Sequence, residues 1–402
     1  MKIGIIREGK IPPDSRVPLS PAQCASLQHE GIDLVVQPAK GRCFPDADYQ
    51  AAGIRLQEDL SDRTLLLGVK EVPIDLLIPH KTYCFFSHTI KEQAYNRALL
   101  QAILKHHIHL VDYEVLTDVD GRRLIAFGKF AGMVGAHNAL LTYGQRTGQP
   151  VLKRMKDHQD YAEAVAYYKQ TAFPAVKIVL TGTGRVARGA ALVLTDMGFK
   201  KLPPDEYLTA KASHQAIFTQ LECKHYAARI DGSPFDKEDF YQHPDLFKSI
   251  FQPYAAASDI MINGIYWDNK APAFFTKEEM RQSDFNIEVI ADVTCDIAPV
   301  SSIPSTLRPT TIAAPFFGYD PTTEAETQPF QEHTIDMMTI DNLPNELPRD
   351  ASVAFGEQFI NRILPEFLGQ RNTGVIERAS IAKDGQLGPH FQYLENFVRA
   401  AS

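Results

Sequence analysis

The chain has 402 residues, of which 44% are apolar and 22% charged, and its formal net charge is -8. A chain of this length is expected to form two domains, and its acidic balance disfavours nucleic acid and anionic membranes as partners. The five cysteines lack zinc-ligand spacing, so we expect reduced thiols and no metal site. The N-terminus has neither a secretory nor a membrane-spanning segment, which favours a cytoplasmic protein that acts on small molecules.

The first third of the chain alternates short β-rich runs with helical patterns, which predicts a parallel sheet. Ser20 can cap a helix that has Pro21 in its first turn and ends near Gly31. A second helix is expected over 92–106, with one apolar face made of Tyr95, Leu99, Leu100, Ile103 and Leu104. The predicted strands are 2–6, 34–37, 65–69, 83–86 and 108–112.

A second unit is predicted to begin after Gly132 with a helix. It continues with a helix over 161–171 and strands at 176–180, 260–265, 287–293 and 337–340. From residue 350 the tail has a helical pattern. Segment 202–254 is a long polar insertion to which the sequence assigns no role.

These patterns predict an α/β protein made of two Rossmann-like domains with parallel sheets and an active site in the cleft between them. Residues 1–133 with 344–402 would form the catalytic, substrate-binding domain, and residues 134–343 the dinucleotide-binding domain.

A glycine turn supplies the clearest functional motif. The strand AVKIVLT runs into Gly182 and Gly184, and Ala187 takes the third small position of GxGxxG/A at the start of a helix. The unpaired amides and positive dipole end of that helix suit the phosphates of NAD or NADP. A plain glycine turn is the alternative, but strand, turn and helix together favour a cofactor site.

The choice between NAD and NADP stays open in the sequence. We expect the second strand of this domain to end near 200–206, where Asp205 or Glu206 would bind the ribose hydroxyls of NAD. Lys200 and Lys201 stand beside them and could instead meet a 2′-phosphate.

Ionisable side chains end two predicted strands of the first domain. Lys70 follows LLLGV, where its ammonium would emerge at a strand end and not on a solvated helix face, a position that favours function. His88 follows CFFS, where it could transfer protons near neutral pH if it faces the cleft, or could be a structural histidine. Arg16 could clamp a carboxylate with two hydrogen bonds, or could pair with Asp14 or Glu8 on the surface.

Several separated motifs resemble the lysine-ketoglutarate reductase family: HKTYCFFSHTIK, GTGRVARGA, INGIYW and IDNLP. The run REGKIPPDSRVPLSP is similar to the N-terminal signature of the broader superfamily of alanine dehydrogenases and lysine-forming saccharopine dehydrogenases. The resemblance implies an NAD(P)-dependent oxidoreductase that condenses L-lysine with 2-oxoglutarate through an imine and reduces it to saccharopine. A homo-oligomer is compatible with it.

The same resemblance implies roles for individual residues. Lys70 and His88 match the family's catalytic pair, and Glu71 and Glu114 match acidic residues that tune them. Substrate would contact Arg16, Gln93, Phe127 and Thr294. The cofactor would contact Gly182, Gly184, Arg185, Val186, Arg122, Tyr266, Val293, Ile340, Asp341 and Leu343, with Asp205 added from the strand argument.

Two alternatives remain at this point. An alanine dehydrogenase-like or other opine-type amino acid dehydrogenase would keep the fold and cofactor but change the amine donor. A protein of another class would retain the nucleotide site as a non-catalytic sensor.

Overall fold

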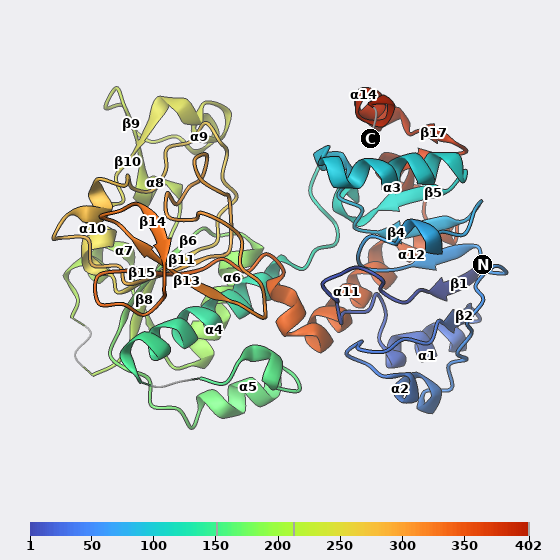
Figure 1. The fold of residues 1–402 in the computed structure, drawn as a ribbon, viewed down its shortest axis with the longest axis horizontal. Coiled ribbons are helices and arrows are strands. Elements are labelled where there is room, and N and C mark those ends of the chain that lie inside the picture. The colour runs from blue at the N-terminus through green and yellow to red at the C-terminus, as the bar shows by residue number, and fades with distance from the viewer. Residues whose placement is uncertain (150–151, 212–213, 401–402) are drawn as a thin grey trace. The chain divides into compact units, whose positions relative to one another are not determined.

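The computed structural model describes residues 1–149, 152–211 and 214–400, which divide into two units. Unit 1 comprises Met1–Phe127 and Pro348–Ser402, and unit 2 comprises Gly128–Leu347. Both are built of strands with helices between them (Figure 1), so the α/β class expected from the alternating patterns is confirmed. No helix within the described residues is long and apolar enough to cross a membrane.

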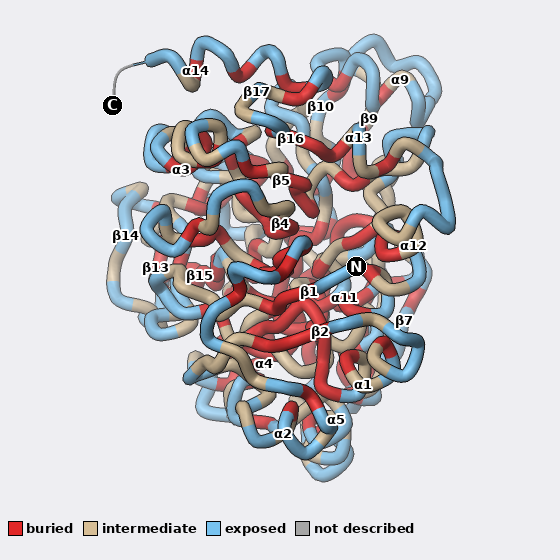
Figure 2. Tube along the Cα trace, turned by 90° about the vertical axis from the view of Figure 1, so that its right-hand side faces the viewer, coloured by how far each residue is buried: buried red, intermediate tan, exposed pale blue. Residues whose placement is uncertain are grey.

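Unit 1 contains a seven-stranded sheet, as far as the described residues show, in the order β17-β16-β5-β4-β3-β1-β2. The strands from β1 to β5 pair in parallel, as expected. The strands are β1 (Lys2–Ile5), β2 (Asp33–Val36), β3 (Leu65–Leu67), β4 (Thr82–Phe85), β5 (His109–Asp112), β16 (Ser380–Lys383) and β17 (Gln386–Leu387). Figure 2 shows how the buried residues follow β1 and β2.

The expectation of a purely parallel sheet and a purely helical tail was wrong at the end of the chain. β16 pairs antiparallel with β5, and β17 pairs antiparallel with β16. Only two residues separate β16 from β17, and a link this short forms a hairpin, whereas a parallel connection needs a long crossover.

The helices of unit 1 follow their local signals. Ser20 caps α1, and its hydroxyl and the Gln23 side chain form a reciprocal capping box. The side chains of Leu99 and Ile103 on α3 are buried, but Tyr95 is 65% exposed, so its assignment to the apolar face was wrong. Tyr95 lies in the first turn of α3, before the buried stretch begins at Asn96. The helices are α1 (Pro21–His29), α2 (Asp46–Ala51), α3 (Ala94–Lys105), α11 (Pro348–Arg362), α12 (Leu364–Phe367), α13 (Val375–Ala379) and α14 (Glu395–Arg399).

The larger sheet of unit 2 has the order β14-β13-β15-β12-β11-β6-β8-β7 in the described chain. It is parallel except for β13 and β14, which pair antiparallel at one edge and again correct the expectation of parallel strands only. The strands are β6 (Lys177–Thr181), β7 (Lys200–Lys201), β8 (Ile217–Leu221), β11 (Ile260–Asn263), β12 (Val289–Asp292), β13 (Phe316–Asp320), β14 (Ala325–Thr327) and β15 (Ile335–Met338). A separate antiparallel pair is formed by β9 (Ala227–Arg229) and β10 (Phe247–Ser249).

Two helices of unit 2 cross closely beside the glycine turn. A Cβ atom placed on Gly132 would lie 1.8 Å from the carbonyl oxygen of Val186, so only glycine lets α4 approach α6 this closely. The helices of the unit are α4 (Gly128–Thr147), α5 (Tyr161–Tyr168), α6 (Arg185–Asp196), α7 (Pro204–Thr209), α8 (Cys223–Tyr226), α9 (Lys237–Gln242) and α10 (Gln252–Ala257).

Candidate functional site

The ionisable residues of unit 1 gather where two neighbouring strands end. Lys70 and Glu71 follow β3, and His88 follows β4. β3 and β4 pair in parallel, with Leu67 opposite Cys84, so their carboxyl ends meet at one edge of the sheet. In open α/β sheets this edge is where ligands bind.

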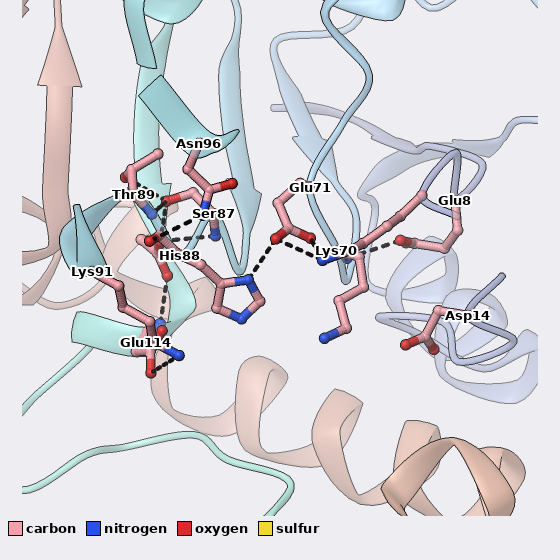
Figure 3. Close-up of polar contacts among 12 residues, drawn as sticks. Glu8, Asp14, Lys70, Glu71, Ser87, His88, Thr89, Lys91, Asn96 and Glu114 are labelled. Carbon is pink, nitrogen blue, oxygen red and sulfur yellow. Dashed lines mark hydrogen bonds and ion pairs between the residues drawn. The ribbon is translucent and has the colours of Figure 1, made fainter. Parts of the chain in front are cut away.

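Glu71 is the centre of a charged network. One carboxylate oxygen lies 2.6 Å from Nδ1 of His88, and the carboxylate also lies 2.7 Å from Nζ of Lys10. Burial alone would raise the pKa of Glu71, but the hydrogen bonds from His88 and Lys10 outweigh it and hold the pKa at about 2. Glu71 is therefore a carboxylate at neutral pH. Figure 3 shows it between His88 and Lys70.

A second acidic side chain, Glu8, accepts hydrogen bonds from the backbone that carries Lys70. Glu8 accepts the backbone N–H of Val69 at 2.6 Å and that of Lys70 at 2.8 Å, one with each oxygen. Burial raises the pKa of Glu8 to about 8. Burial, together with the charge of Arg16, lowers the pKa of the Lys70 ammonium. Lys70 is thus more easily deprotonated than an exposed lysine.

Arg16 pairs with Asp14, one of the two partners considered from the sequence, but the pair is buried and not on the surface. Its Nε and Nη2 donate to the two oxygens of Asp14 at 2.9 and 2.6 Å, and its guanidinium lies 4.3 Å from the ring centre of Phe127. Phe127 in turn stacks on Phe355 at 4.7 Å. Arg16 is only 3% exposed, because the ring and the carboxylate cover it.

The three other acidic, amide and basic residues predicted for unit 1 are Glu114, Gln93 and Arg122. Glu114 pairs with Arg123 at 3.1 Å and with Lys91 at 3.8 Å. Gln93 is exposed at the start of α3, and the side chain of Arg122 is 78% exposed and 3.5 Å from Asp120. The sequence did not point to Lys10, although it belongs to the REGK run, because its partner Glu71 is 61 residues away.

The glycine turn of unit 2 has the conformation that the motif requires. Gly182 has φ +96°, and a Cβ there would lie 2.7 Å from the carbonyl oxygen of Gly264. Gly184 precedes α6, and no side chain among the described residues caps that helix. A glycine with open space around it at an uncapped helix N-terminus fits a pyrophosphate. Arg185 and Val186 form the first turn of α6.

A pocket of about 480 Å³ lies at this turn. Gly182, Gly184 and Tyr266, three residues predicted for the cofactor, line it. Asp205 lies on α7 and is not among the lining residues. Glu222 is among them.

The second strand of unit 2 in chain order, β7, ends at Lys201, within the range expected from the sequence, but it does not pair with β6. β7 lies at the edge of the sheet, and β8 lies between it and β6. The strand beside β6 therefore ends at Leu221, and Glu222 follows it, where an acidic residue would meet a ribose. Its side chain is 2.7 Å from Lys224, whose hydrogen bond lowers the pKa of Glu222. The signal for Glu222 in the sequence is that this acid directly follows the strand-like run 217–221.

The remaining predicted residues follow β12 and β15. Thr294 donates through its hydroxyl to the carbonyl oxygen of Ile265 at 2.8 Å, which ties two loops at the carboxyl ends of the strands together. The backbone N–H of Asp341 donates to Thr310 at 3.4 Å. Ile340 and Leu343 are buried, and Val293 lies against α4.

The chain is similar in sequence to known enzymes over most of its length. Residues 4–134 match the family described as alanine dehydrogenase/PNT, N-terminal domain. The chain is 29% identical over 450 residues to alpha-aminoadipic semialdehyde synthase of Arabidopsis thaliana, covering 98% of this chain and 41% of that one. It is 27% identical over 383 residues to saccharopine dehydrogenase (NAD(+), L-lysine-forming) of Emericella nidulans. The match covers 90% of this chain and 91% of that one.

Among solved structures, an L-alanine dehydrogenase matches with a TM-score of 0.66 at 16% identity, covering 99% of this chain and all of that one. The two-domain Rossmann-like fold is therefore confirmed. The chain spans less than half the length of the first curated relatives that it matches. The motif resemblance is also confirmed, since homologues with these names extend over most of the chain.

Proposed function

We propose that this homologue of the L-lysine-forming saccharopine dehydrogenases is itself an NAD(P)-dependent oxidoreductase that joins L-lysine to 2-oxoglutarate and yields saccharopine. The relatives' names support the substrate class. The observation that carries the proposal is the network of Lys10, Glu71 and His88 beside Lys70, because this reaction needs a proton acceptor and a proton donor close together.

The bond changes define what these residues must do. The side-chain nitrogen of the substrate lysine bonds to the keto carbon of 2-oxoglutarate, and water leaves to give an imine. A bound reduced nicotinamide would supply a hydride, and the hydride together with one proton converts the imine to a secondary amine. The amine must lose a proton before it attacks, and the departing hydroxyl must gain one.

Lys70 suits the first proton transfer. Because its pKa is lowered, Lys70 gives up its proton more readily than an exposed lysine, and its amine would then accept the proton of the substrate ammonium. Glu8 holds the backbone at Val69 and Lys70, so the side chain starts from a fixed point.

His88 suits the second proton transfer. With Nδ1 held by the Glu71 carboxylate at 2.6 Å, Nε2 is the nitrogen left to donate a proton to the departing hydroxyl. The carboxylate also stabilises the ring while it is positively charged.

In unit 2 the nucleotide would be held by the glycine turn and Glu222. The first turn of α6 would bind the pyrophosphate, and the Glu222 carboxylate would accept hydrogen bonds from the ribose hydroxyls. Because a carboxylate repels a 2′-phosphate, we propose NAD as the preferred nucleotide.

A steady-state panel tests the proposal. Lysine, ornithine, alanine and ammonia are each combined with 2-oxoglutarate or pyruvate, and oxidation of NADH and NADPH is followed. We expect turnover with lysine and 2-oxoglutarate, and its loss in His88→Ala but not in His29→Ala, a matched exposed histidine at the end of α1. Turnover with pyruvate and ammonia alone would contradict the proposal and favour an alanine dehydrogenase activity.

A further inference from the structure

The segment between β8 and β11 carries a small substructure of its own. β9 and β10 form an antiparallel pair outside the main sheet, and α9 lies between them in the sequence (Figure 1). Phe240 of α9 packs edge-on against Phe247 of β10 at 5.1 Å, and Phe235 contacts the same ring at 5.6 Å. These aromatic contacts tie α9 to the strand pair, so this part of the polar insertion has a packed core.

This substructure forms one wall of the pocket at the glycine turn. Phe240, Tyr241 and Pro244 line the pocket from the inserted side, and Trp267 lines it from the loop that follows β11. Gly182, Gly184 and Glu222 line it too. The same cavity therefore joins a phosphate-binding turn, an acid suited to ribose hydroxyls, and a compartment with aromatic walls.

Tyr241 is exposed, and its hydroxyl contacts Cys223. The residue is 61% exposed. The Cys223 thiol donates to the hydroxyl oxygen of Tyr241 at 3.8 Å, and the Tyr226 hydroxyl donates to the Cys223 sulfur at 3.3 Å. Cys223 directly follows Glu222. The phenol ring thus lines the same pocket as Glu222, the residue proposed to meet the ribose, and most of its surface is exposed.

We propose that α9 and its strand pair form an adenosine-recognition element, in which the adenine base lies in the aromatic compartment against Tyr241. The inference rests on the proposed nucleotide function of unit 2. With phosphates at the first turn of α6 and a ribose at Glu222, the base is the next group along the ligand. A planar purine gains stacking energy and dispersion contacts from aromatic walls.

The cavity size agrees with this occupant. About 480 Å³ lies in the range of roughly 300–1,000 Å³ that is typical of small-molecule sites. The ligand class is an adenine nucleotide, including AMP and ADP-ribose. The nicotinamide mononucleotide half lacks the adenine base and would not use Tyr241.

The test measures binding by isothermal titration calorimetry with the full chain, using ADP-ribose, NADH and reduced nicotinamide mononucleotide. In Tyr241→Ala we expect the Kd of ADP-ribose and NADH to rise about tenfold, within the range that base–aromatic stacking supplies. The Kd of the mononucleotide should stay the same. Tyr241→Phe keeps the ring and should bind like the unaltered protein.

Leu246→Ala is the matched control, since Leu246 belongs to the same insertion, is 40% exposed and does not line the pocket. An unchanged Kd for ADP-ribose and NADH in Tyr241→Ala would overturn the inference and leave the proposed function intact. So would an equal loss for all three ligands, which would indicate a general disturbance. If the unaltered chain bound no adenine nucleotide, both the inference and the proposed function would fail.

Discussion

Replacing Glu71 by glutamine changes one charge at the centre of the network in unit 1. The variant keeps the size of the side chain but puts a neutral amide 2.6 Å from Nδ1 of His88 and 2.7 Å from Nζ of Lys10. Unit charges about 4 Å apart attract by about 4 kcal/mol at an effective dielectric constant of 20. Both side chains are mostly buried, at 10% exposed for Glu71 and 17% for His88, so solvent weakens this attraction only in part.

We therefore expect about 2–4 kcal/mol less stabilisation of the positively charged ring while His88 carries its proton, and kcat/KM to fall about 30- to 1,000-fold. The assay is steady-state oxidation of NADH with lysine and 2-oxoglutarate. The affinity for NADH should not change, because the glycine turn and Glu222, which we propose to hold the nucleotide, belong to unit 2. Glu58→Gln, at an exposed acid that pairs with Arg7, is the control. A kcat/KM within twofold of the unaltered protein would refute the electrostatic reasoning.

Three further outcomes follow from particular groups. Gly182→Val should abolish the binding of NADH, measured by calorimetry, because valine is strained at φ +96° and its Cβ would lie 2.7 Å from the carbonyl oxygen of Gly264. If the variant kept its affinity for NADH, the turn would not be part of the nucleotide site. Glu222→Ser removes a negative charge that would repel the 2′-phosphate of NADPH. We therefore expect kcat/KM with NADPH, relative to kcat/KM with NADH, to rise about tenfold or more. An unchanged ratio would contradict the role proposed for Glu222. The pKa of Glu71 is about 2 in the folded protein against an ordinary 4.5, so its carboxylate contributes stability above pH 4.5 that is lost as pH falls through 2. Urea titrations should show the advantage of the unaltered protein over Glu71→Gln shrinking by up to about 3 kcal/mol across that range, whereas a difference independent of pH would argue against the low pKa.

Local sequence signals predicted most of the elements. The strand, glycine turn and helix from β6 to α6 are contiguous, so each part supports the others and their positions agree with the structure within one residue or two. Ser20 and Gln23 likewise start α1 by contacts three residues apart. Signals of this kind do not depend on the rest of the fold.

Pairing between distant segments escaped prediction. β8 lies inside the segment that we interpreted as a polar insertion, and nothing local shows that it, and not β7, pairs with β6. For this reason an acid for the ribose was sought near residue 205 and not after β8, where we propose Glu222 for this role. Lys10 is a similar case, because its ion pair with Glu71 depends on β1 and β3 being neighbours in the sheet.

The most direct test of the proposed activity is the identity of the product formed from lysine labelled with ¹⁵N at its side-chain nitrogen, 2-oxoglutarate and NADH. The proposal predicts a secondary amine in which the labelled nitrogen joins the lysine carbon chain to carbon 2 of the former keto acid, detected by mass spectrometry. Formation of glutamate without lysine carbons, or consumption of NADH with no labelled product, would contradict it.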